Sequence, residues 1–365
     1  MSAPPERILV VKLADLGDAL TATPALRALR ETYPQARVDV LTSPAGAVVL
    51  GNLPGVAHII EADRHLLDSP AAWVRPRTWQ RVAALARGLS RADYDCLLLM
   101  HHLSSTVGAL KWRVLVAAVA GARSVGLDNG RGRFLDVRVE DRGFAALHEV
   151  EYGLQLAAAV GASCSDHSLQ LQLPQDASER ADALLAPIKG YRYVTIHPGS
   201  GDYSPARRWF PERFAAVADE LSSHLGLAVV LVGGPRDDVE SVRALMSEPS
   251  LDLSRRTDIP TLAAILSRSA LFLGGDSGVM HLATAAGAPV LALFGPTDAR
   301  AWGPWRPPMP GAAPVSVLQG VCPWRGPCLY VGHSVGRRHG CPTRDCLRSI
   351  QVQDVLERAD AIVHR

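Results

Sequence analysis

Long apolar runs are missing from this sequence of 365 residues. No segment reaches the ~18 uninterrupted apolar residues of a membrane-spanning helix, and the apolar stretch that ends at Lys12 is too short for the core of a signal peptide. We therefore expect a cytoplasmic protein. Net charge is also scarce: the formal value is +2, which predicts no general affinity for nucleic acid.

Low-complexity tracts and solenoid-type repeats are absent as well, and 48% hydrophobic with 20% charged residues is typical of a soluble globular protein. The chain is too long for one ordinary core, so we expect two domains, at residues 1–165 and 190–350, with a last helix in 351–365. The segment Ser163–Lys189, which contains Pro174 and Pro187, is the expected hinge between them.

Apolar, β-rich runs alternate with helical patterns along the whole chain, which indicates an α/β fold with parallel sheets and crossover helices. Strands are predicted near 7–13, 37–41, 58–60, 96–100, 124–126, 193–197, 228–232, 271–274 and 290–294. Helices are predicted near 20–33, 75–89, 105–120, 148–160, 211–224, 236–246, 260–267, 277–286 and 352–363. Two nucleotide-type sheets of this kind imply a ligand held in a cleft between them.

The first polar segment that carries chemistry follows the first strand. Gly17 and Asp18 lie in a short loop between strand and helix, where open α/β folds place their ligands. A carboxylate there can accept a proton from a sugar hydroxyl. Alternatively, Asp18 only caps a helix that begins at Ala19. Asp15 is interpreted as a turn or capping residue.

The second segment is the loop after the strand at 193–197. Gly199 and Ser200 offer N–H and hydroxyl donors, and Arg207 or Arg208 can bind phosphate oxygens with two N–H groups. The alternative is a solvated loop in which Arg208 lies on Trp209.

The third segment runs from Phe272 to His281, where a strand breaks on two glycines before a helix that opens with Asp276, Ser277 and Gly278. The start of a helix carries unpaired N–H groups and partial positive charge, so it suits a diphosphate. The alternative is an ordinary turn capped by Asp276 or Ser277.

Taken together and in this order, the motifs in these segments resemble those of the heptosyltransferase family of glycosyltransferases (glycosyltransferase family 9). The matching motifs are Lys12 with Gly17-Asp18, His148-Glu-Val-Glu151, His197-Pro-Gly-Ser200 with Arg207-Arg-Trp209, Asp276-Ser-Gly-Val-Met-His281 and Phe294-Gly-Pro-Thr297. They extend from about Arg7 to about Ile350.

The resemblance implies a GT-B architecture, in which two Rossmann-like domains face a central cleft, the first binding the acceptor and the second the nucleotide sugar. It implies inverting, metal-independent transfer of a heptose from ADP-heptose to the lipopolysaccharide inner core. Asp18 matches the family's general base, Ser200 and Arg207 match positions that hold the diphosphate, and the donor-binding helix start matches Asp276, Gly278 and His281. No Asp-x-Asp pair stands where a metal-dependent transferase needs one, and a cationic helix start with Arg207 can stabilise the leaving diphosphate instead.

Three departures affect the expected nucleotide and sugar more than the fold. Arg207 stands where many members carry Lys, Phe210 replaces a usual proline, and Leu253–Thr257 lacks a usual glycine. One alternative is therefore a family relative that uses another nucleotide sugar or acceptor glycan. Another is a non-catalytic nucleotide-sugar-binding protein. A dinucleotide oxidoreductase is disfavoured because the first strand-loop-helix lacks Gly-x-Gly-x-x-Gly.

Four of the six cysteines, Cys322, Cys328, Cys341 and Cys346, lie close together in the tail. Four thiolates can hold a structural zinc or iron, although the inner gaps are wider than in usual sites, and unbound reduced thiols are the equal alternative. Disulfides are the least favoured use in a reducing compartment. Cys96 and Cys164 are interpreted as packing residues.

A basic helical stretch contains no acidic residue and is accompanied by Trp73 and Trp79. Its cations are Arg75, Arg77, Arg81, Arg87 and Arg91. A solvated helix face is one interpretation. The other is peripheral contact with anionic lipid of the inner membrane, as suits an enzyme with a lipid-linked acceptor. His101 and His102 end a strand and are candidate acceptor contacts or structural residues.

Overall fold

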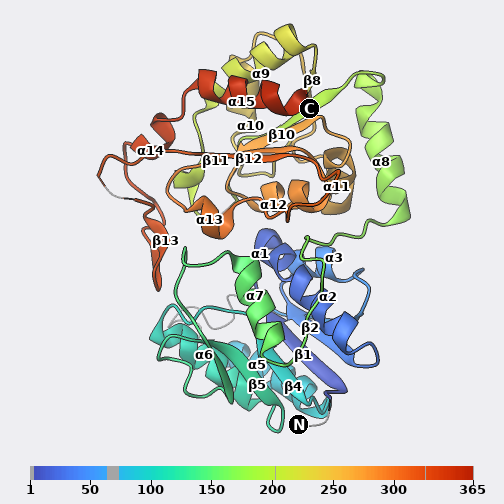
Figure 1. The fold of residues 1–365 in the computed structure, drawn as a ribbon, viewed down its shortest axis with the longest axis vertical. Coiled ribbons are helices and arrows are strands. Elements are labelled where there is room, and N and C mark those ends of the chain that lie inside the picture. The colour runs from blue at the N-terminus through green and yellow to red at the C-terminus, as the bar shows by residue number, and fades with distance from the viewer. Residues whose placement is uncertain (1–3, 64–73, 202, 325, 365) are drawn as a thin grey trace. The chain divides into compact units, whose positions relative to one another are not determined.

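The computed structural model describes residues 4–63, 74–201, 203–324 and 326–364. The chain divides into two compact units. Unit 1 comprises Met1–Gln170 with Gly332–Ser334, and unit 2 comprises Leu171–Val331 with Val335–Arg365. Each unit has a six-stranded parallel sheet with helices packed against it (Figure 1).

In unit 1 the strands are β1 (Arg7–Lys12), β2 (Arg37–Thr42), β3 (Val56–Glu61), β4 (Cys96–Leu99), β5 (Arg123–Asp128) and β6 (Val137–Glu140). The helices are α1 (Leu16–Thr21), α2 (Thr23–Thr32), α3 (Pro44–Leu50), α5 (Pro76–Arg91), α6 (Thr106–Ala117) and α7 (Glu149–Ala158).

In unit 2 the main strands are β7 (Tyr193–His197), β8 (Ala228–Leu231), β9 (Ser250–Asp252), β10 (Leu271–Gly275), β11 (Val290–Phe294) and β12 (Val315–Gln319). A two-stranded sheet is formed by β13 (Leu329–Val331) and β14 (Ser334–Gly336). The helices are α8 (Gln175–Leu185), α9 (Pro211–Leu225), α10 (Val239–Leu245), α11 (Ile259–Leu266), α12 (Gly278–Ala285), α13 (Ala299–Trp302), α14 (Asp345–Arg348) and α15 (Val352–Val363), with short 3-10 turns at Ala186–Ile188 and Pro205–Arg207.

The two sheets have the same strand order. Unit 1 reads β3-β2-β1-β4-β5-β6 and unit 2 reads β12-β11-β10-β7-β8-β9, which is the first order read from the other edge. In this doubly wound topology all strands stay parallel, but the order in which successive strands are added changes direction between β1 and β4 and between β7 and β10. Such folds bind ligands at the carboxyl ends of those strands. The loops after these four strands are therefore where a site is expected.

Strand β1 shows how the unit 1 core forms. Its residues are apolar on both faces, as in a parallel strand covered on both sides. Leu9 and Val11 face a buried cluster that includes Leu89 of α5 and Trp112 of α6. Ile8 and Val10 are equally buried, and α2 packs against α7 elsewhere in the unit. The sheet edge that carries the loops is thus held on a rigid layer.

The unit 2 core is centred on aromatic packing against β7. Trp209 and Phe214 are almost fully buried and meet edge to face, with ring centroids 5.1 Å apart. The Trp209 indole N–H donates to the carbonyl of Leu347, 3.2 Å away, so the polar atom of this side chain is satisfied. Truncating Phe214 to alanine should cost about 3–5 kcal/mol of stability.

The predicted strands and helices are confirmed, with differences of a few residues at their ends. The strands β6, β9 and β12 were not predicted, because they are short and lie at sheet edges, where they are only half-buried. The expected hinge is not simply a linker, because it contains α8, whose Ala177 and Ala181 are buried. Trp73, predicted to accompany the basic helix, lies outside the described residues.

Candidate functional site

Asp18 lies at the carboxyl edge of the unit 1 sheet, in the first turn of α1. This helix begins at Leu16 rather than Ala19, so Asp18 is not its cap, and Asp15 occupies the N-cap position. The backbone N–H of Ala19 donates to the carbonyl of Asp15 at 2.9 Å. Gly17 is buried and Asp18 half-buried, which leaves the carboxylate partly accessible.

The loops after β1 and β4 are joined by His101. The backbone N–H of Leu13 donates to His101 Nε2 at 2.9 Å, and the imidazole stacks on Trp112 with ring centroids 4.2 Å apart. Burial, together with the charge of Lys12, lowers the pKa of His101 well below its ordinary value. His101 Nε2 can accept the N–H of Leu13 only when the ring is neutral, so the lowered pKa agrees with this hydrogen bond. His101 is thus a structural residue at the topological switch point.

His102 is the centre of a buried charged cluster that the sequence did not disclose. Its Nδ1 lies 2.9 Å from Asp141 and its Nε2 lies 3.0 Å from Glu149, so both ring nitrogens face carboxylates. Burial alone lowers the pKa of His102, but the two carboxylates outweigh burial and raise it to about 9. Burial raises the pKa of the Glu149 and Asp141 carboxyls, but their contacts with His102 outweigh burial and lower it overall. All three groups are therefore charged at neutral pH.

The start of α7 positions Glu149 within this cluster. His148 caps the helix, its Nδ1 accepting the N–H of Val150 at 3.2 Å, and Glu151 accepts the N–H of His148 at 2.8 Å. This reciprocal pair is a capping box. The motif His148–Glu151 therefore opens a helix, as predicted, and holds the next carboxylate against His102.

In unit 2 the predicted diphosphate residues form one hydrogen-bonded network. Arg207 Nη1 donates to Asp276 at 3.1 Å, and Arg207 Nη2 donates to the carbonyl of Ser200 at 2.7 Å. Arg208 Nε donates to Ser200 Oγ at 3.3 Å, and Thr297 Oγ1 donates to Asp276 at 2.8 Å. Residues from the loops after β7, β10 and β11 are thus brought together.

His197 and Asp237 complete this network. His197 Nδ1 lies 3.3 Å from Ser277 Oγ, and His197 Nε2 lies 3.2 Å from Asp237, which also accepts the N–H of Gly234 at 2.8 Å. Burial raises the pKa of the Asp237 carboxyl, but the His197 and Gly234 hydrogen bonds and the Arg208 charge outweigh it and hold the pKa at about 2. The sequence did not predict a role for Asp237. The one pattern that marks its position is the Gly-Gly-Pro turn after β8.

Gly199 is required where it stands because of Asp237. A Cβ at position 199 would lie 1.9 Å from Asp237 Oδ1, far inside contact distance. Gly275 is less tightly enclosed, since a Cβ there would lie 3.2 Å from the carbonyl of Arg207, slightly closer than ordinary contact. These glycines let three loops and their backbone N–H groups approach one another at the switch point.

The start of α12 is capped by Ser277, as the alternative of an ordinary capped turn predicted. Ser277 is the N-cap residue and its Oγ accepts the N–H of Met280 at 3.3 Å, while Gly278 begins the helix. Asp276 instead pairs with Arg207. His281 is the fourth residue of α12 and is buried. The other alternative, Arg208 lying on Trp209, does not occur, because the guanidinium over that indole is Arg213, 6.0 Å from the ring centroid.

The tail cysteines do not form a metal site in the described part of the chain. No group of three or more His, Cys, Asp or Glu side chains is arranged to hold a metal ion there, and all six cysteines are free thiols. Cys346 is buried, whereas Cys328 and Cys341 are exposed. Burial raises the pKa of Cys346 to about 11. The charges of Cys322, Cys328 and Cys341 also raise the pKa of Cys346, which places the four thiols near one another.

The basic helix α5 presents its cations to solvent: Arg77, Arg81, Arg87 and Arg91 are all exposed. Trp79 on the same helix is 40% exposed. Over the described residues, no helix is both long and apolar enough to cross a bilayer.

Residues 82–310 match the family model of glycosyltransferase family 9 (heptosyltransferase). The chain is 26% identical over 301 residues to lipopolysaccharide heptosyltransferase 3 of Escherichia coli K12, covering 79% of this chain and 82% of that one. It is 22% identical over 299 residues to the lipopolysaccharide core heptosyltransferase OpsX of Haemophilus influenzae, covering 80% and 79%.

Among solved structures, a family 9 glycosyltransferase from Veillonella parvula shares the fold with a TM-score of 0.76 at 21% identity, covering 100% of this chain and 99% of that one. The ADP-heptose heptosyltransferase II of Escherichia coli shares it with a TM-score of 0.70 at 22% identity, covering 98% of both. The fold is therefore the GT-B fold of these enzymes. The family match spans more than half of the chain and includes the Arg207–Asp276 network, so the chain belongs to glycosyltransferase family 9, the heptosyltransferase family, and is a glycosyltransferase.

Proposed function

We propose that this enzyme transfers a heptose from ADP-heptose to an inner-core acceptor of lipopolysaccharide, with inversion and without a catalytic metal. The observation that carries the proposal is the connected network of Ser200, Arg207, Asp276 and Ser277 at the switch point of unit 2. It presents a cation, hydroxyls and a helix N-terminus at the strand ends where such sheets bind phosphates. Relatives named as lipopolysaccharide heptosyltransferases, and a solved Escherichia coli heptosyltransferase with ADP-2-deoxy-2-fluoro heptose, support the donor and acceptor.

The proposed chemistry is a single displacement. The carboxylate of Asp18 takes the proton of an acceptor hydroxyl, the oxygen forms a bond to the anomeric carbon, and the bond from that carbon to the diphosphate breaks. ADP leaves with the bonding electron pair. The guanidinium of Arg207 and the N–H groups at the start of α12 stabilise its charge, which is the role a metal has in other transferases.

Unit 1 is proposed to bind the acceptor and unit 2 the donor. Asp18 and Gly17 lie at the strand ends of unit 1, whereas Gly199, Arg208, Gly278 and His281 belong with the donor residues of unit 2. We propose a cytoplasmic location with peripheral contact between α5 and the inner membrane, because α5 exposes four arginines and Trp79 and contains no acidic residue.

For the tail we propose reduced thiols rather than a structural zinc or iron, because among the described residues no three His, Cys, Asp or Glu side chains are arranged to hold a metal ion. Metal analysis of the purified protein, combined with thiol titration, separates the two uses. Stoichiometric metal released together with four thiols would overturn this part of the proposal.

The test of function pairs a donor panel with one substitution. Purified protein is mixed with ADP-heptose, other ADP-sugars, GDP-sugars and UDP-sugars, and thermal shift and nucleotide release are measured. ADP-heptose should bind and be consumed in the presence of acceptor. Asp18→Asn should lower turnover about 10²–10⁴-fold and keep the donor-induced shift.

A response to UDP-sugars alone would assign the enzyme to another donor. Full turnover by Asp18→Asn would remove Asp18 as the base. Donor binding with no release of nucleotide by the wild type, for any acceptor, would point to a non-catalytic binding protein.

A further inference from the structure

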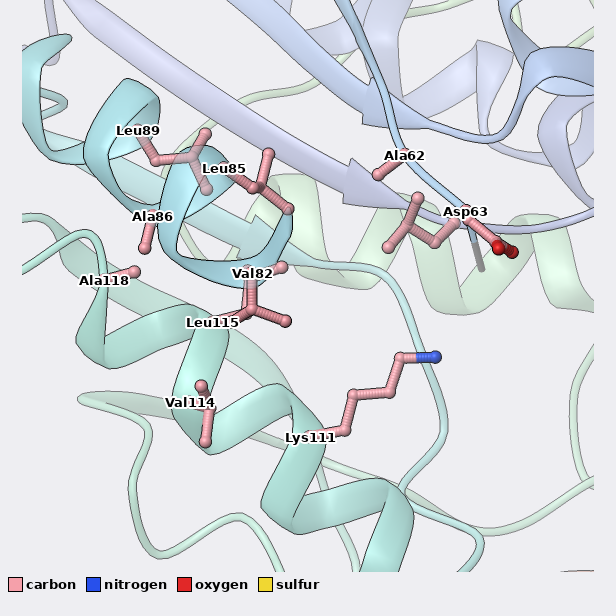
Figure 2. Close-up of a pocket in the computed structure, with 11 residues that line it drawn as sticks. Ala62, Asp63, Val82, Leu85, Ala86, Leu89, Lys111, Val114, Leu115 and Ala118 are labelled. Atoms are coloured by element: carbon pink, nitrogen blue, oxygen red, sulfur yellow. The ribbon is translucent and has the colours of Figure 1, made fainter. Parts of the chain in front are cut away.

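A narrow pocket of about 50 Å³ opens between α5 and α6 in unit 1 (Figure 2). Helix α5 contributes Val82, Leu85, Ala86 and Leu89, which recur at the spacing of one helix face. Leu89 is buried, and the other three are half-buried against the opening. The α5 arginines lie on the opposite face of the helix, so the face that lines the pocket is apolar.

Helix α6 closes the other side of the pocket with Val114 and Leu115. This helix is apolar nearly all round, and Val107 and Leu110 remain 50% and 45% exposed. A helix of this character is normally buried in a core or against another apolar phase. In unit 1 it leaves aliphatic side chains at the surface beside an apolar pocket.

One end of the pocket is polar. Lys111 and Asp63 line it there, and Figure 2 shows both charged groups pointing to the same side, away from the apolar side chains. Lys111 Nζ lies 4.9 Å from the centroid of the Trp112 ring. The pocket thus changes from aliphatic to charged along its length.

The polar end adjoins a second hollow at the carboxyl ends of β1, β2 and β3. Ala62 and Asp63 line both spaces, and the second hollow, of about 470 Å³, adds Asp15, Ser43 and Glu61. Carboxylates accept hydrogen bonds from sugar hydroxyls, whereas the Ser43 hydroxyl already donates to the carbonyl of Ala14 and accepts the N–H of Gly46. Asp15 caps the same helix that carries the proposed base, so this hollow lies at the acceptor edge of the sheet.

We propose that the α5–α6 pocket binds the aliphatic tail of the lipid-linked acceptor, while sugar hydroxyls of its head occupy the hollow at Asp63. The inference rests on the proposed function, because it assigns part of that acceptor to a named place. An apolar pocket that continues into a polar hollow matches an amphiphile rather than a free sugar. Helices α5 and α6 also carry six cations and no acidic residue, although the whole chain has a net charge of +2, which favours the anionic groups of such a lipid.

The experiment uses n-alkyl glucosides with tails of increasing length, below their micelle concentrations, titrated calorimetrically into the full-length protein without donor. Affinity should rise about fourfold for each added methylene until the pocket is full. Ala86→Trp should fill the pocket and abolish this dependence. Ala84→Trp is the matched control, because Ala84 is exposed on α5 and does not line the pocket.

Alkyl phosphocholines with the same tails separate the acceptor from an ordinary bilayer lipid. They should bind at least tenfold more weakly, since they lack the hydroxyls that the hollow accepts. Equal affinity would overturn the assignment to the acceptor and indicate a bilayer lipid. No dependence on tail length in the wild type, or an equal dependence in both tryptophan variants, would overturn the pocket itself.

Thermal shift with ADP-heptose keeps the two proposals apart. Ala86→Trp should retain the donor shift of the wild type, which also shows that the variant is folded. A normal donor shift with no tail binding rejects only the pocket, whereas tail binding without any donor shift rejects the proposed transfer.

Discussion

Replacing His102 by asparagine tests whether a buried imidazolium holds together the loops at the carboxyl edge of the unit 1 sheet. The wild-type ring lies between Asp141 and Glu149 at 2.9 and 3.0 Å. Its pKa of about 9 exceeds the ordinary value of 6.5, and at ~1.4 kcal/mol per pKa unit the difference corresponds to about 3 kcal/mol of stability. The same interaction viewed from the carboxylates gives a similar size, because a buried ion pair that loses one partner typically costs about 3–5 kcal/mol.

The sign of the pH dependence follows from the raised pKa of His102. Below pH ~6.5 the ring is protonated in both the folded and unfolded chain, and its full stabilisation is present. As pH rises from there through about 9, the unfolded chain loses the proton first, so the stabilisation falls away. Wild-type protein should therefore lose about 3 kcal/mol in this window beyond what the variant loses.

Differential scanning fluorimetry from pH 6 to 10 measures this effect. For a unit of about 170 residues, 1 kcal/mol moves the melting temperature by about 2–4 °C, so wild type and His102→Asn should differ by roughly 6–12 °C near pH 6.5 and converge above pH 9. The variant acts as the control for every other group that titrates in alkali. Parallel curves, with a constant difference at all pH values, would refute a charged His102.

Three further predictions concern unit 2 and the chemistry. Gly199→Ala should abolish the ADP-heptose thermal shift and lower stability, because its Cβ would lie 1.9 Å from Asp237 Oδ1. The control, Gly88→Ala, lies in open space on α5 and should be neutral or stabilise the protein by up to ~1 kcal/mol. Equal behaviour of the two variants in fluorimetry would contradict this prediction. Asp237, with its pKa held at about 2, contributes stability above pH ~4 that disappears as pH falls toward 2, so acid unfolding of Asp237→Asn should show a shallower slope there; an unchanged slope argues against the pair with His197. Nucleotide release should be unaffected by excess EDTA, and a loss restored by Mg²⁺ would disprove transfer without a metal.

The sequence predicted the layered α/β fold and most elements because their signals are local. Apolar runs such as Tyr193–His197 and Val290–Phe294 end where predicted, since a strand covered on both faces reads as an unbroken apolar stretch between turn residues. The first helix was predicted near residue 20, whereas α1 begins at Leu16, because Asp18 resembles a cap; Asp15, interpreted as a turn or capping residue, does occupy the N-cap position. Helix α8 was hidden in a segment whose two prolines suggested a linker.

Short motifs also located the candidate site, but not its internal bonding. Ser200 and Arg207 lie in the loop after one predicted strand and Asp276 directly follows another, so the sequence placed them near a sheet edge. Their mutual pairing joins residues up to 69 apart in the chain, and no local pattern shows it. The role of Asp237, which binds His197 and makes glycine necessary at position 199, arises in the same way.

By itself the sequence determined most of the segments that become strands and helices, which family they belong to, and which polar residues stand near strand ends. Tertiary structure decided which of those residues share a hydrogen bond and which are charged. His102 illustrates the difference, because its partners lie 39 and 47 residues away and come from a strand end and a helix start. Its protonation depends on burial and on two distant carboxylates, which exist as neighbours only once the parallel sheet has folded.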